Sequence, residues 1–204
     1  MFSTTTRVLL VSSLAACAVA SYTFRRRQNR GNTRGGKISN PKVLWLFFAI
    51  WFWLFECAAL AFEPSLPFSV RVICGAHALS MWLRGGVELV MLHVFKNWKP
   101  PLGIAHDLFS IGTVFVLAGV LGVAQWGFWA WGLVVALVFS LCVETLYAWL
   151  FFGAVKGKTT GDDGIWFASE DDARFRRINR LTFACNTPQV LFQLALLGAG
   201  FGLL

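Results

Sequence analysis

The stretch MWLRGGVELVMLH, residues 81–93, places Arg84 and Glu88 inside a run that is otherwise apolar. The two residues are four apart, so on a helix they share one face and can pair directly. His77 precedes Arg84 by two helical turns and falls on the same face. A charge at the centre of a bilayer costs at least ~2.5–3.5 kcal/mol, so this stripe is expected to face the bundle interior or water. Two residues within it favour close helix approach or a bend: Gly85 and Gly86.

Two later apolar segments carry polar stripes of their own. One contains Ser140, Glu144 and Tyr147, and the other contains Thr182, Asn186, Gln189 and Gln193. At ~1.5 Å per residue, Glu88, Glu144 and Asn186 all lie roughly 8–12 Å from the same end of their segments. We therefore expect a polar pocket in that half of the bundle, with three further residues at its mouth: His93, His106 and Asp107.

These residue types are suited to acid–base chemistry. Two carboxylates beside an arginine can hold protons with different strength, which general acid and base catalysis requires. The candidate catalytic residues are Glu88, Glu144, Arg84, His106 and Asp107. The candidate substrate-binding residues are Asn186, Gln189, His77, Arg177 and Arg180. The alternative is structural, because buried Arg–Glu pairs and membrane amides also hold helices together.

A divalent metal is a further possibility, with His93, His106 and Glu88 as ligands. The spacing gives it little support, since Glu88 and His93 are five apart and so lie on different faces of a helix. Two facing histidines at one depth, as haem would need, are not evident. The sequence GAVKGKTTGDDG is one residue too short between its glycines for a phosphate-binding loop. The cofactor content is therefore left unknown.

Composition identifies the class of protein that holds these residues. The chain has 204 residues, of which 57% are hydrophobic and only 14% charged. A soluble domain of this size has about 25% charged residues. The sequence predicts an all-α, polytopic integral membrane bundle with about six transmembrane helices, or five if the first is cleaved. The expected spans are 8–22, 43–62, 68–95, 107–125, 127–152 and 181–204.

The basic residues predict the orientation. They concentrate in segments 25–42, 96–107 and 153–180, which share one side if every span crosses once, and connections 63–67 and 125–127 carry none. Positive loops stay inside. The net charge of +8 is therefore assigned to topology and anionic lipid, and nucleic acid is not expected as a partner. The membrane is predicted to be the bacterial or the mitochondrial inner membrane.

The first segment has three interpretations. An uncleaved anchor fits best, because the arginines that follow residue 22 resist translocation. A mitochondrial presequence and a secretory signal peptide are the alternatives. The chain is accordingly divided into 1–42, an anchor or targeting segment with a basic loop, and 43–204, the bundle, with a loop and an interfacial helix at 153–180. The arginines of that helix would bind phosphate-bearing headgroups, with Phe175 and Ile178 in the lipid boundary.

Three functions remain open. The leading one is a membrane-embedded enzyme that acts on a lipid or other hydrophobic substrate from the inner leaflet. The second is a small-molecule transporter or channel subunit, and the third a non-catalytic assembly subunit of a membrane complex. The expected partners are membrane lipids, a hydrophobic small molecule, and a homo-oligomer or larger membrane complex.

Overall fold

The computed structural model describes residues 1–30, 37–95, 99–155 and 173–203, and all secondary structure in these ranges is helical. The predicted all-α class is confirmed. Six helical rods form a bundle, because α2, the π-helical stretch η1 and α3 run on as one rod. The elements are α1 (Thr4–Arg30), α2 (Asn40–Ile50), η1 (Trp51–Glu56), α3 (Cys57–Leu60), α4 (Phe68–His93), α5 (Pro100–Leu121), α6 (Phe128–Val155) and α7 (Ala173–Phe201).

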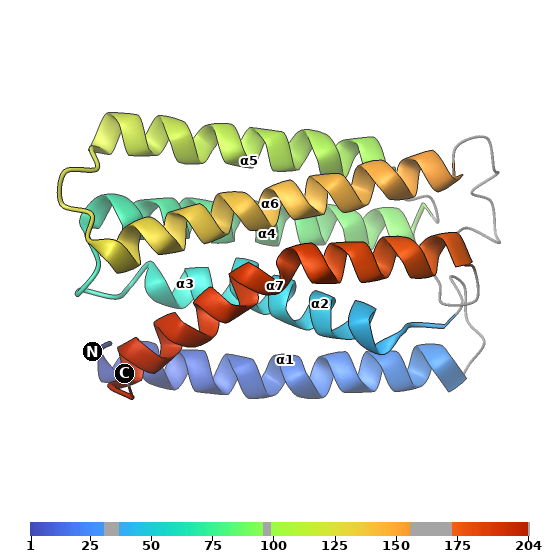
Figure 1. Cartoon of the computed structure of the whole chain (residues 1–204), viewed down its shortest axis with the longest axis horizontal. Helices are drawn as coiled ribbons and strands as arrows, with labels where there is room; N and C mark the ends of the chain where they lie inside the picture. Colours follow the sequence, from blue (N-terminus) through green and yellow to red (C-terminus); the bar gives the residue numbers. More distant parts are fainter. Residues whose placement is uncertain (31–36, 96–98, 156–172, 204) are drawn as a thin grey trace.

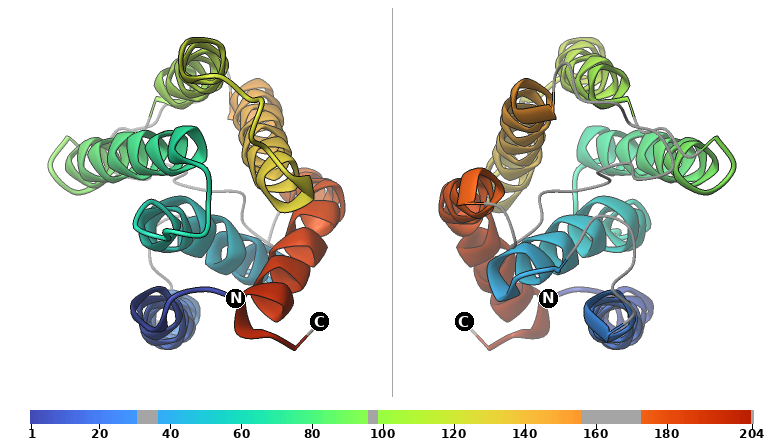
Figure 2. Two further views of the ribbon diagram at one scale, coloured as in Figure 1. Left: turned by 90° about the vertical axis from the view of Figure 1, so that its left-hand side faces the viewer. Right: turned by 90° about the vertical axis from the view of Figure 1, so that its right-hand side faces the viewer.

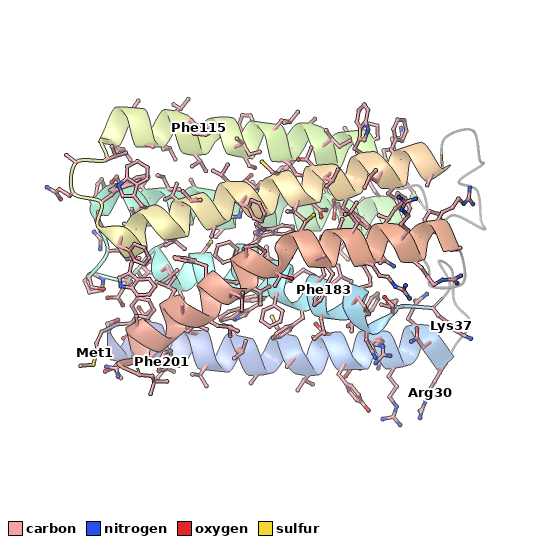
Figure 3. The ribbon with its side chains drawn as sticks, in the orientation of Figure 1. Met1, Arg30, Lys37, Phe115, Phe183 and Phe201 are labelled. Atoms are coloured by element: carbon pink, nitrogen blue, oxygen red, sulfur yellow. The ribbon has the colours of Figure 1, made fainter. Side chains whose placement is uncertain are left out.

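Consecutive rods run in opposite directions along the long axis of the bundle, which is horizontal in Figure 1. The C-termini of α1, α4 and α6 and the N-termini of α2, α5 and α7 lie at the same end of the molecule. We call this the basic end, since Arg30 and Lys37 lie there, whereas Met1 and Phe201 lie at the other (Figure 3). In the end view, α5 and α1 are on opposite sides, with α4, α2–α3, α6 and α7 between them (Figure 2). Within the described residues, the predicted three basic segments therefore share one end.

The chain is an integral membrane protein by the length and apolarity of its helices. Four rods are long and apolar enough to cross a bilayer: Thr4–Arg30, Asn40–Leu60, Pro100–Leu121 and Phe128–Ala154. The other two rods, α4 and α7, carry the charged and amide residues that lower their hydropathy. Large apolar side chains are exposed on α5, where Phe115 is 64% exposed and Val120 is 77% exposed. Figure 3 shows Phe115 on α5 at the edge of the bundle. Lipid accounts for such an outer surface, which a water-soluble protein rarely presents.

The helix starts follow local chemistry. The Ser39 side chain accepts a hydrogen bond from the Lys42 backbone N–H at 3.1 Å, and Pro41 occupies the first turn of α2. Proline is favoured there because its missing donor has no helical partner. For the same reason α5 begins at Pro100, seven residues before the predicted start at Asp107. The two prolines do separate α4 from α5, as the sequence predicted, but they lie inside the second helix.

The start of α7 differs from its prediction. Residues 173–180 continue directly into the last span as one helix, Ala173–Phe201, with no break between an interfacial and a spanning part. Phe175 and Ile178 are buried in the protein core rather than in the lipid boundary. Phe175 stacks on Phe151 with ring centroids 5.5 Å apart. The ring of Phe175 on α7 gains more from stacking on Phe151 of α6 in the core than it would gain in the membrane–water interface.

The first segment packs against the rest of the bundle. Trp51 donates its indole N–H to the Ser13 hydroxyl at 3.0 Å, and Leu10 is buried in the core. The backbone N–H of Phe2 donates to the Gly200 carbonyl at 2.7 Å, which ties α1 to the end of α7. These contacts join the first helix to the bundle, and its role as an anchor or a targeting segment stays a prediction.

Replacement of Gly132 by alanine is expected to destabilise the bundle. A Cβ at Gly132 on α6 would lie 2.6 Å from the Cζ atom of Phe192 on α7, so the helices would have to separate or the ring would have to move. Overpacking of this kind costs about 1–3 kcal/mol. Thermal unfolding in detergent should show a lower Tm for G132A. Gly119→Ala is the control, because nothing lies within 4 Å of its Cβ position, and an equal loss there would contradict the prediction.

Acid is expected to weaken the end of the bundle opposite the basic end, through Glu63. This buried carboxylate accepts backbone hydrogen bonds from Ser3 at 2.9 Å and Ser65 at 3.0 Å. Burial alone would raise the pKa of Glu63, but the hydrogen bonds from Ser65, Ser3 and Thr6 outweigh it and lower the pKa from 4.5 to about 2. A depressed pKa stabilises the fold above the unfolded value, and this contribution is lost as the pH falls from 4.5 to about 2.

Thermal unfolding at pH 6 and pH 3 measures this contribution. The wild type should lose more stability over the interval than Glu63→Gln, whose amide does not titrate. An identical loss in both proteins would show that other carboxylates cause the acid sensitivity.

Candidate functional site

Arg84 is the centre of a charged cluster that joins three helices. Its guanidinium donates from Nε to Glu88 Oε1 at 2.9 Å, from Nη2 to Glu144 Oε1 at 3.1 Å, and from Nη1 to Asp107 Oδ1. Arg84 and Glu88 belong to α4, Asp107 to α5 and Glu144 to α6. The predicted convergence of Arg84, Glu88 and Glu144 is therefore present, and their catalytic role stays a prediction. We call these four residues the Arg84 cluster.

Asp107 occupies a different position from the one predicted. It was expected at the mouth of the pocket, but it is fully buried and paired with Arg84. The reason is the early start of α5, which carries Asp107 two turns into the helix. Gly103, one turn before Asp107, makes room for the arginine, since a Cβ there would lie 3.2 Å from Arg84 Nη2.

The close approach predicted at Gly85 and Gly86 is absent. A Cβ at either position would have nothing within 4 Å among the described residues. The glycine that the site uses is therefore Gly103, on the facing helix.

The cluster has more negative than positive groups. One guanidinium faces three carboxyl groups, which leaves a formal charge of −2 if all are ionised. Lys42 supplies a second cation nearby: its buried ammonium lies 3.5 Å from the centroid of the Tyr147 ring and 3.9 Å from that of Trp45. Tyr147 follows Glu144 by one helical turn. The remaining imbalance can be met by a proton on one carboxyl group or by a positive group from outside, so the cluster is chemically able to exchange protons.

A large cavity adjoins the cluster. It measures about 650 Å³ and lies between α1, the α2–η1 rod, α4 and α6, and we call it the main cavity. Glu88, Glu144 and Lys42 contribute its charged part. The remaining walls are mostly apolar or aromatic: Ala16, Cys17, Ala20, Ser21, Phe24, Val43, Trp45, Leu46, Phe47, Ile50, Leu54, Phe55, Trp82, Leu89 and Tyr147. Pockets for small ligands typically measure about 300–1,000 Å³ and combine apolar walls with a few polar groups.

A second, smaller cavity of about 330 Å³ lies on the other side of the cluster, between α4 and α5, and we call it the α4–α5 groove. Arg84 and Glu88 line it together with Ser80 and His106. The Ser80 hydroxyl lies 2.8 Å from His106 Nε2, and His106 Nδ1 lies 3.5 Å from Asp107 Oδ1. Ser80 was not among the predicted site residues, although it precedes Arg84 by one turn and so shares its face.

The polar stripe of α7 also faces the interior, but its hydrogen bonds lead to Glu56 and not to the Arg84 cluster. Gln189 donates to Gln193, and Gln193 donates to Glu56 Oε2 at 2.7 Å. Glu56 belongs to η1, and π-helical stretches often occur at functional sites. The prediction that Asn186 and Gln189 share the pocket of Glu144 is not supported, since neither lines the main cavity.

Two predicted binding residues are buried without a partner among the described residues. Both side-chain atoms of Asn186 and both ring nitrogens of His77 lack a hydrogen bond there. Arg177 and Arg180 are exposed on the first turns of α7, at the basic end. The structure therefore does not bring the five predicted substrate-binding residues together.

The predicted metal ligands are only partly within the structure. The His93 side chain lies outside the described residues. Among the described side chains, no group of three or more His, Cys, Asp and Glu residues is placed to hold a metal ion. Arg84 takes the position between the carboxylates that a cation would otherwise occupy.

Comparison of the chain with protein-family models, with curated proteins and with solved structures finds no match. The functional conclusions therefore depend on the geometry of the Arg84 cluster and its two cavities.

Removal of the Arg84 charge is expected to destabilise the protein severely. Arg84→Gln would leave Asp107 and Glu144 buried without their cation, and breaking a buried ion pair in this way costs about 3–5 kcal/mol. Glu88→Gln should cost much less, because the Glu88 side chain is 32% exposed and Arg84 keeps its pairs with Asp107 and Glu144. Thermal unfolding in the same detergent compares the two variants, and equal losses would contradict the central role of Arg84.

Proposed function

We propose that the protein is a membrane-embedded enzyme that acts on a lipid or another hydrophobic molecule. The observation that carries this proposal is the position of Glu144. Its carboxylate is held by Arg84 through Oε1, whereas Oε2 has no hydrogen-bond partner among the described residues, and the residue lines the main cavity. A buried, oriented carboxylate with one oxygen uncommitted can accept a proton from a bound molecule or return one to it.

The walls of the main cavity support a hydrophobic substrate. Helix α1 contributes alanine and phenylalanine side chains, and the α2–η1 rod contributes aromatic ones. An apolar chain would replace lipid contacts with protein contacts, while its polar end would meet Glu144, Glu88 and Lys42. Cation–π contacts to Trp45 and Tyr147 hold the Lys42 ammonium beside that polar end, where it can offset negative charge that develops during reaction.

The basic end supports entry from the inner side of the membrane. Lys42 lies two residues after the start of α2, and Phe24 lies six residues before the end of α1, so the main cavity extends toward the basic end. By the positive-inside rule this end faces the cytoplasm, or the matrix in a mitochondrion. We therefore place the reaction in the inner leaflet of a bacterial or mitochondrial inner membrane.

Turnover of lipids in reconstituted vesicles tests this proposal. The purified protein is inserted into liposomes made from the total lipid extract of its expression host, and the lipids are compared by mass spectrometry before and after incubation. The wild type should convert at least one lipid species. Glu144→Gln should slow that conversion by about 100-fold or more, as expected for loss of a general acid or base.

Glu56→Gln is the matched control. Glu56 is also a buried carboxylate on a membrane helix, but its partner is Gln193 and it does not line the main cavity. This variant should retain turnover. Ala16→Trp, which fills the apolar part of the main cavity, should weaken substrate binding. Vesicles that show no lipid conversion but a Glu144-dependent solute flux would favour the transporter instead.

A further inference from the structure

Two residues that line the α4–α5 groove, Ser80 and His106, follow the order of a nucleophile and a base, and the buried carboxylate of Asp107 lies behind them. Ser80 Oγ lies 2.8 Å from His106 Nε2, and His106 Nδ1 lies 3.5 Å from Asp107 Oδ1. Serine-based acyl transfer uses the same sequence of contacts, and the same geometry recurs on unrelated folds. Neither Ser80 nor His106 lines the main cavity, so the proposed nucleophile and base lie outside the site assigned to Glu144, although Arg84 links the two sites.

We propose that Ser80 is the nucleophile of an acyl-transfer centre, with His106 as its general base and an ester-linked acyl lipid as substrate. For Ser80 to donate its hydrogen, His106 must be neutral and carry its own hydrogen on Nδ1. That tautomer leaves Nε2 free to accept from the Ser80 hydroxyl, although Nε2 also lies 3.3 Å from the Ser80 carbonyl oxygen. It puts the hydrogen on the nitrogen nearest Asp107 Oδ1, which already accepts from Arg84, and Asp107 would act as a positioning residue. The 3.5 Å separation is longer than a hydrogen bond, and such contacts commonly tighten when substrate binds.

The position of the pair supports access from both the protein and the lipid. Ser80 and His106 both line the groove, and the His106 side chain is 20% exposed. The groove walls include apolar side chains that are more than half exposed on the membrane-facing surface: Leu83, Val87, Leu102 and Phe109. An acyl chain can therefore reach Ser80 from the bilayer without crossing a polar surface.

Arg84 is a cationic side chain on the groove wall that is already paired with the three carboxyl groups of the Arg84 cluster. It follows Ser80 by one turn of α4 and lines the same groove. When Ser80 attacks the ester carbonyl, negative charge develops on the carbonyl oxygen, and a cation on the groove wall would lower the energy of that state. Lys99, at the start of α5, lines the groove as well and would face a phosphate-bearing headgroup.

The reaction balances in two steps. In the first, Ser80 Oγ bonds to the carbonyl carbon, its proton moves to His106 Nε2, and the ester C–O bond breaks as His106 returns the proton to the leaving alcohol. In the second, water attacks the acyl-serine by the same route, which releases a free acid and restores Ser80. Water is the only co-reactant, and no oxidation or reduction takes place.

A long-chain alkyl fluorophosphonate tests the proposal, because it reacts with activated serines and enters membranes. The full-length protein is labelled in lipid bilayers, and the adduct is located by mass spectrometry. The wild type should carry one adduct, on Ser80, with fluoride as the leaving group. His106→Asn should label at least about 100-fold more slowly, which is the lower range for loss of a general base.

Three controls keep the result interpretable. Ser80→Ala should not label, whereas Ser110→Ala should label as the wild type does, although its hydroxyl lies only 3.4 Å from that of Ser80. Circular dichroism and gel filtration check that the variants are folded. If His106→Asn fails to fold, His106→Gln replaces it, since its amide can keep a hydrogen bond to Ser80 but cannot accept a proton as a base.

Two results would overturn the proposal. One is an absence of any adduct on Ser80 in the folded wild type. The other is an adduct whose rate of formation is unchanged in the folded His106→Asn or His106→Gln variant. Either result would mean that the hydrogen bond between Ser80 and His106 only holds α4 against α5.

Discussion

The structure depends on one electrostatic constraint: one arginine, two buried carboxyl groups and a third that is partly exposed must stay together in a membrane. Each of these charges would be costly alone, since neither lipid nor the protein interior solvates ions well. Arg84 meets Asp107 and Glu144 from two other helices, so α4, α5 and α6 cannot slide or rotate independently. The cluster thereby sets the register of the three helices, which apolar packing alone specifies poorly in lipid.

The same constraint creates two chemically different surfaces. On one side, Glu144 and Glu88 border the largely apolar main cavity with Lys42 opposite. On the other, Arg84 and Glu88 border the α4–α5 groove with the Ser80–His106 pair. A shared set of charges means that a change on one side alters the electrostatic potential on the other. The excess of carboxyl groups over cations explains why such a cluster can take part in proton transfer as well as hold helices together.

Parts of the site were predictable, and the reasons are local. Charge is rare in apolar segments, so the sequence singles out Arg84, Glu88 and Glu144. Their equal depth in two spans predicted that they meet, and the structure shows that they do. Asp107 was placed wrongly because two prolines were taken as a break, whereas they begin the helix. Ser80 gave no signal, because serine is common in membrane helices and its importance depends on His106, 26 residues away.

The sequence by itself determined that this is a helical membrane bundle with its basic segments at one end, because length, apolarity and charge act locally along each segment. Only the tertiary structure decided which polar groups meet. Gly103 was inconspicuous until its missing side chain was seen to admit Arg84, and Asn186 matched Glu144 in depth but does not share its cavity. Depth along a helix follows from residue counting, whereas the direction in which a helix faces depends on its packing against every neighbour at once.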